Sequence, residues 1–63
     1  MTTAELVRLL KKNGCYFIDK GARHDFMKSP ITGREFMIGR HGSQEVATGT
    51  LHKILKAAGV SLK

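Results

Sequence analysis

The sequence has no tryptophan, a single cysteine, a single proline and five acidic residues among 63 positions. The lone Cys15 excludes an internal disulfide and suits a reducing compartment, so we expect a cytoplasmic protein with Cys15 as a small buried residue. No apolar run approaches the roughly 20 residues that span a bilayer, and no signal-peptide pattern opens the chain. Cysteine and histidine show none of the short paired spacings of a zinc site. We therefore expect no metal and no other cofactor.

Eleven lysines and arginines give the chain a net charge of +6, and 41% of its residues are hydrophobic. This length predicts one domain, spanning residues 1–63, with a modest core. A small domain with so strong a positive charge indicates an anionic partner. The basic residues are spread over predicted loops, strands and helices, unlike those of a basic membrane-surface helix. Nucleic acid is therefore the leading partner, and an acidic protein is compatible with it.

A helix is predicted at each end of the chain. The first begins at a capping box, Thr2-Thr3-Ala4-Glu5, and ends at Asn13-Gly14. The second begins near Thr48 and ends at Gly59, with Val60 supplying the contact that often follows such an end. Both carry apolar residues at helical spacing, which we assign to the core: Leu6, Leu9, Leu10, Leu51, Ile54, Leu55 and Ala58.

Three strands are predicted between the helices, at Cys15–Asp19, His24–Ser29 and Arg34–Ile38. A turn with proline and glycine, Ser29–Gly33, joins the last two. The order is α-β-β-β-α. The three strands form an antiparallel meander, with one face of the sheet exposed to solvent.

In the third strand, Phe36 and Ile38 share a parity, and we expect Phe26 to face the helices with them.

The most informative stretch runs from Lys20 to Lys28. Gly21 permits a turn, and His24 follows where the loop becomes a strand, with Lys20, Arg23 and Lys28 around it. An imidazole that titrates near neutrality in a basic field suits proton transfer on a phosphate-bearing substrate. The alternative is a surface histidine without a role.

The loop from Gly39 to Ala47 carries Arg40 and His41, and such loops often hold functional side chains. His41 is either a second active-site residue or a solvent-exposed loop histidine. We interpret His52 as a solvated residue of the last helix.

The element order and three motifs resemble the HicA-type toxins of HicAB toxin–antitoxin pairs, which are small mRNA interferases. The motifs are the helix end at Asn13-Gly14 with the turn Gly21-x-x-His24, the pair Arg40-His41, and Gly49-Thr50-Leu51-x-x-Ile54-Leu55-Lys56-x-Ala58-Gly59. The resemblance covers nearly the whole chain. It implies an α+β fold like that of double-stranded-RNA-binding domains, with both helices on one face of the sheet.

The resemblance also implies an endoribonuclease in which His24 is catalytic. RNA cleavage needs no metal, because the 2′-hydroxyl can attack the phosphate once it is deprotonated. It further implies a HicB-type antitoxin that occludes the site, and contact with operator DNA only through the toxin–antitoxin complex. The candidate RNA-binding residues beside His24 are Lys20, Gly21, Arg23, Lys28, Arg40 and His41. Either His41 or a lysine could protonate the leaving oxygen.

The chain departs from the family pattern at three positions. Cys15 stands where many relatives have tryptophan, Ala22 replaces a serine of the turn, and Gly39 replaces the proline before Arg-His. The change at Ala22 puts any role of a turn hydroxyl in doubt. Two other functions fit the composition: a non-catalytic RNA-binding module, and a protein-interaction domain with an acidic partner.

Overall fold

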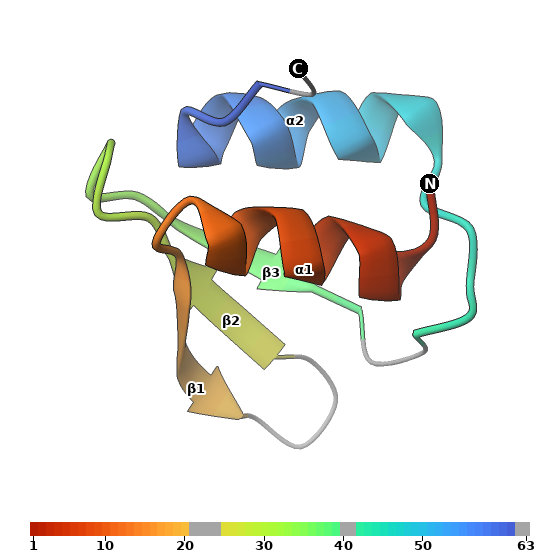
Figure 1. Cartoon of the computed structure of the whole chain (residues 1–63), viewed down its shortest axis with the longest axis horizontal. Helices are drawn as coiled ribbons and strands as arrows, with labels where there is room; N and C mark the ends of the chain where they lie inside the picture. The colour runs from red at the N-terminus through yellow and green to blue at the C-terminus, as the bar shows by residue number, and fades with distance from the viewer. Residues whose placement is uncertain (21–24, 40–41, 62–63) are drawn as a thin grey trace.

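The computed structural model describes residues 1–20, 25–39 and 42–61, with only the backbone of residues 19 and 20. The elements are α1 (Thr3–Lys12), β1 (Tyr16–Lys20), β2 (Asp25–Lys28), β3 (Glu35–Ile38) and α2 (Thr48–Ala58), as Figure 1 shows. This order confirms the predicted α-β-β-β-α arrangement, and the strands begin one residue later than expected. None of these helices is long and apolar enough to cross a membrane.

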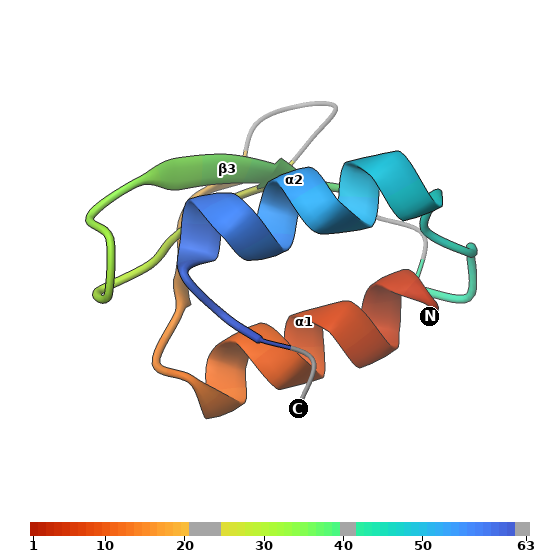
Figure 2. The ribbon, with the colours of Figure 1, turned by 90° about the horizontal axis from the view of Figure 1, so that it is seen from above.

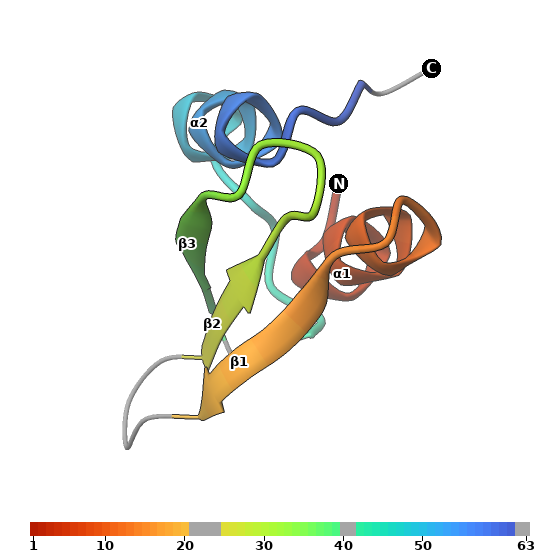
Figure 3. The same cartoon turned by 90° about the vertical axis from the view of Figure 1, so that its left-hand side faces the viewer.

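The strands form one open antiparallel sheet in the order β1-β2-β3. Both helices lie on the same side of this sheet, as expected, and Figure 3 shows the other side without a helix. The two helices run in the same direction, so both begin at the same end of the molecule (Figures 1 and 2). The fold thus has two layers, with the core between them.

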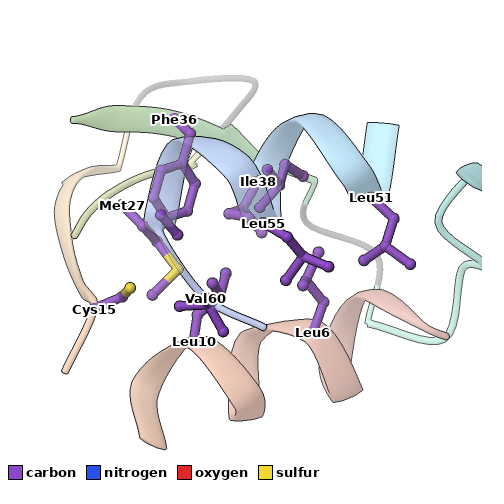
Figure 4. Packing of buried hydrophobic residues seen from close by; sticks show 11 residues of the cluster. Leu6, Leu10, Cys15, Met27, Phe36, Ile38, Leu51, Leu55 and Val60 are labelled. Atoms are coloured by element: carbon purple, nitrogen blue, oxygen red, sulfur yellow. The ribbon is translucent and has the colours of Figure 1, made fainter. Parts of the chain in front are cut away.

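The core is built from the inward-facing residues of β2 and β3 and from the apolar stripes of both helices (Figure 4). Met27 and Phe36 are paired across the two strands and are 0% and 8% exposed. The expected place of Phe26 in the core is therefore wrong. Phe26 pairs with Met37, whose side chain is 49% exposed, on the face that turns away from the helices.

Both helix ends follow from local sequence. Thr2 and Glu5 form the predicted capping box, with the Thr2 hydroxyl accepting from the Glu5 N–H and the Glu5 carboxylate accepting from the Thr2 N–H. Gly14 has φ of 93°, and Gly59 has φ of 68°. Gly59 is the left-handed cap of α2, and Val60 donates its N–H to the Leu55 carbonyl oxygen and is buried, as predicted.

The turn between β2 and β3 is fixed to the end of α2. Ser29 is fully buried, and its hydroxyl donates to the Ala58 carbonyl oxygen while accepting from the Ile31 N–H. The hydroxyl of Thr32 donates to the carbonyl oxygen of Ala57. These bonds satisfy carbonyl groups that the end of a helix leaves without a partner. The turn residues therefore also serve as caps for a helix that is distant in sequence.

Candidate functional site

Most of the predicted site lies outside the described residues. Gly21, Arg23 and His24 fall in the segment 21–24, and Arg40 and His41 fall in the segment 40–41. The structure describes the backbone of Lys20 and all of Lys28. The described residues on either side of each segment nevertheless show where the chain leaves and rejoins the fold.

The residues that flank the segment 21–24 lie at one end of the sheet. Lys20, the last residue of β1, is paired with Asp25, the first residue of β2, and Asp25 is paired with Ile38 of β3. Gly39, the last described residue before the segment 40–41, follows Ile38 directly. The chain therefore leaves the sheet for both segments at the same end, although residues 25–39 separate them in the sequence. This is the end at which the sequence predicts the catalytic residue.

Lys28 lies away from this end. It is the last residue of β2, three residues beyond Asp25, and it is paired with Tyr16 on one side and Glu35 on the other. At about 3.4 Å per residue, this places its backbone roughly 10 Å from that of Asp25. The sequence grouped Lys28 with Lys20 around His24, and strand geometry separates the two lysines.

The loop that follows the segment 40–41 is bonded to the start of α1. Thr3 donates its backbone N–H to the Gln44 carbonyl oxygen at 2.9 Å, and its hydroxyl donates to the same oxygen at 3.2 Å. Ala4 donates its N–H to the Gly42 carbonyl oxygen, also at 2.9 Å. The first N–H groups of a helix have no partner within the helix. Here the loop provides carbonyl oxygens that accept hydrogen bonds from two of these N–H groups.

Two charged contacts strengthen this junction. The Met1 ammonium pairs with the Glu45 carboxylate, which raises the pKa of the ammonium group. Hydrogen bonds from the backbone and then the side chain of Thr2 lower the pKa of Glu5. Both carboxylates are solvent-exposed, so these contacts order the chain locally without a buried charge.

A pocket of about 340 Å³ opens at the same junction. Its walls come from the start of α1, the start of α2, the end of β3 and the loop between them, and they include Gly39. The floor is apolar, with Leu6 and Ile38 each 1% exposed, while Gln44 and Glu45 supply polar groups at its wall. The sequence carries no signal for this pocket, because it forms only where four distant segments meet.

The described helices carry much of the positive charge. The Nζ atom of Lys11 lies 5.3 Å from the ring centroid of Phe17 and forms a cation–π contact with it. The exposed cations of α1 and α2 that form no ion pair within residues 1–20, 25–39 and 42–61 are Arg8, Lys11, Lys12, Lys53 and Lys56. His52 is exposed among them, as predicted. No three His, Cys, Asp or Glu side chains of the described residues are placed to hold a metal ion, and His24 and His41 lie outside these ranges.

The family model described as "HicA toxin of bacterial toxin-antitoxin" matches residues 3–60, from the start of α1 to the residue after the cap of α2. The chain belongs to the HicA toxin family. No curated protein and no solved structure matches it. Membership of the HicA family makes the chain a toxin of the toxin–antitoxin type, which implies an antitoxin partner. The family assignment agrees with the predicted one, and it rests on a match over residues 3–60 rather than on one motif.

Proposed function

We propose that this HicA-family chain is an endoribonuclease that cleaves mRNA without a metal ion, with His24 as its general base. The observation that carries this proposal is the family match over residues 3–60. The pairing of Lys20, Asp25 and Ile38 supports it, because it brings both ends of segment 21–24 and the start of segment 40–41 to one end of the sheet.

The reaction that fits these residues is an internal transesterification. Neutral His24 takes the proton of the 2′-hydroxyl, and the 2′-oxygen forms a bond to the adjacent phosphorus. The bond from phosphorus to the 5′-oxygen of the next nucleotide breaks, and that oxygen gains a proton. The products are a 2′,3′-cyclic phosphate and a free 5′-hydroxyl. A well-placed general base contributes about 10²–10⁴-fold to such a step.

The basic residues of the two segments have an electrostatic role in this proposal. Negative charge builds up on the phosphate oxygens in the transition state, and fixed positive groups stabilise it. Lys20, Arg23 and Arg40 are the candidates, and His41 or a lysine would donate the proton to the leaving oxygen. Lys28 lies too far along β2 for this role and is assigned to RNA binding only.

The antitoxin is proposed to cover the same end of the sheet. A toxin with a net charge of +6 is most simply inhibited by an acidic surface over residues 20–28 and 40–41. Contact with operator DNA would then come only through the complex. Reversing the charge of Arg23 and Arg40 should slow association with the antitoxin, and an unchanged association rate would place the antitoxin elsewhere.

The test compares His24→Ala with His52→Ala in the presence of a chelator. His52 is an exposed histidine of α2, so its replacement controls for the loss of an imidazole from the surface. Wild-type protein and His52→Ala should cleave a long RNA under single-turnover conditions and leave cyclic phosphate ends. His24→Ala should bind the RNA, melt at the wild-type temperature and cleave at least about 100-fold more slowly.

Two results would contradict the proposal. Cleavage by His24→Ala near the wild-type rate would remove His24 from the mechanism. RNA binding by the wild-type protein with no cleavage under any of these conditions would indicate the alternative, a non-catalytic RNA-binding module.

A further inference from the structure

The face of the sheet that turns away from the helices, here called the outer face, carries large apolar side chains. Its described side chains are those of Tyr16, Phe26, Lys28, Glu35 and Met37, whose pairing places them on the same side of the three strands. Asp19 belongs to the same face, because its backbone is paired with Phe26. Tyr16 is 47% exposed and Met37 is 49% exposed, in contrast to inward-facing Met27 at 0%. No described element covers this face, as Figure 3 shows.

These side chains form a contiguous surface rather than scattered exposed residues. Phe26 and Met37 are direct cross-strand partners. Tyr16 is the direct partner of Lys28, which lies two residues after Phe26, so Tyr16 and Phe26 are diagonal neighbours within reach of each other's rings. The solvent-facing side of an antiparallel sheet is usually polar, and single exposed apolar residues need no explanation. Two aromatic rings and a methionine in adjacent positions do need one.

Lys28 gives this surface its electrostatic character. Its ammonium group makes no ion pair or hydrogen bond with the described residues, and its backbone lies between Tyr16 and Glu35 in one cross-strand row. A free ammonium group beside an exposed aromatic ring matches one nucleotide, in which a base stacks on the ring and a phosphate meets the cation. Glu35 is the direct partner of Lys28 on β3 and Tyr16 its partner on β1, so a phosphate would reach the ammonium group from the Tyr16 side.

We propose that the outer face is a stacking platform for single-stranded RNA, with bases on Tyr16 and Phe26 and a phosphate at Lys28. Phe26 lies two residues after His24, so RNA on this face continues toward the proposed catalytic end of the sheet. The net charge of +6 favours a polyanion over an apolar protein partner. The occupant is a single strand, because duplex bases are stacked on one another and cannot lie on protein rings. The inference rests on the proposed function for its RNA substrate.

The test measures binding of a labelled 2′-O-methyl oligoribonucleotide, as a single strand and as a duplex of the same sequence. This probe lacks the attacking hydroxyl, so binding is measured whether or not His24 is catalytic. The variants are Tyr16→Leu, which keeps an apolar side chain without a ring, and Tyr16→Phe, which keeps the ring. The double variant Tyr16→Leu/Phe26→Leu removes the second aromatic ring as well. Thermal melting confirms that each variant is folded.

Tyr16→Leu should weaken single-strand binding by roughly 5- to 140-fold, and Tyr16→Phe should stay close to wild type. The double variant should bind more weakly still, and the wild-type protein should bind the duplex less tightly than the single strand. Equal single-strand affinity of Tyr16→Leu and wild type would overturn the proposal. Tighter binding of the duplex than of the single strand by the wild-type protein would also overturn it. If Tyr16→Leu lost antitoxin binding while its RNA binding was unchanged, the face would be assigned to the antitoxin instead. Ring-dependent binding together with no cleavage of ordinary RNA would leave this surface standing and refute the proposed catalysis.

Discussion

Ala4 donates its backbone N–H to the carbonyl oxygen of Gly42 at 2.9 Å, which joins the first turn of α1 to the residue directly after His41. Thr3 and Gln44 extend the contact through two further hydrogen bonds to one carbonyl oxygen. The start of α1 therefore holds the loop that returns from the proposed site. The N-terminal helix has a positional role in addition to its contribution to the core.

We expect Thr3→Pro to destabilise the protein, and Thr48→Pro to leave its stability nearly unchanged. Both residues are the first of a helix, where proline is well tolerated because its missing N–H has no helical partner. Both also follow a residue with extended backbone, which proline requires. Only Thr3 gives up hydrogen bonds to the loop, at a cost of about 1–3 kcal/mol. Urea denaturation of the pair measures the difference, and equal midpoints would show that the contact does not contribute to stability.

The elements of the fold could be predicted because their signals are local. The capping box at Thr2, the apolar stripe through Leu51 and the left-handed Gly59 each act within one or two turns of chain. The face occupied by Phe26 could not be predicted in this way. Phe26 and Met27 are adjacent and both apolar. The alternation of a strand places their side chains on opposite faces of the sheet, but it does not indicate which of the two faces the helices. Pairing of Met27 with Phe36 decides it, and that pairing is a property of the whole sheet.

The candidate site could be predicted only in outline. The motifs indicate His24 and Arg40, and the strand order then brings the flanking residues to one end of the sheet. The backbone bonds of Thr3 and Ala4 to the loop have no signal in the sequence, since every residue except proline carries the same N–H group. The burial of Ser29 could not be predicted from the sequence either, because a serine before proline is also typical of an exposed turn.

We expect Gly59→Ala to be more destabilising than Gly33→Ala. The two glycines have nearly the same backbone, with φ of 68° and 72°, so alanine pays a similar left-handed penalty of about 1–2 kcal/mol at each. At Gly59 the added Cβ would also lie 2.9 Å from Thr32 and 3.0 Å from Ile31, whereas at Gly33 it would meet nothing within 4 Å. Such overpacking typically costs a further 1–3 kcal/mol or so.

Thermal melting of the two alanine variants measures this difference. Each 1 kcal/mol shifts the melting temperature of a domain of this size by about 4–8 °C. Equal shifts for the two variants would show that the turn moves away from α2 at little cost.

We expect Ser29→Ala to lower the free energy of unfolding by about 1–3 kcal/mol. The substitution leaves the Ala58 carbonyl oxygen and the Ile31 N–H without the hydroxyl that bonds both of them in the interior. Ser43→Ala is the matched control, because Ser43 is exposed and its hydroxyl makes no hydrogen bond within the described residues. Its effect should stay within about 0.5 kcal/mol. A small effect at Ser29 would mean that water replaces the hydroxyl there.

The capping box predicts a dependence of stability on pH that Glu5→Gln removes. Hydrogen bonds from the Thr2 N–H at 2.8 Å and the Thr2 hydroxyl at 3.0 Å favour the Glu5 carboxylate and lower its pKa. The unfolded chain has an ordinary glutamate pKa of about 4.3. Because the folded-state pKa is lower, the stabilisation is fully present above about pH 4.3 and is lost as the pH falls through the folded-state pKa. The difference in stability between wild type and Glu5→Gln should therefore be constant near neutral pH and shrink in acid. In a Thr2→Ala background the shrinkage should be smaller, because one of the two donors is gone. Urea midpoints measured across this range would contradict the assignment if the difference between the two proteins stayed constant down to the lowest pH.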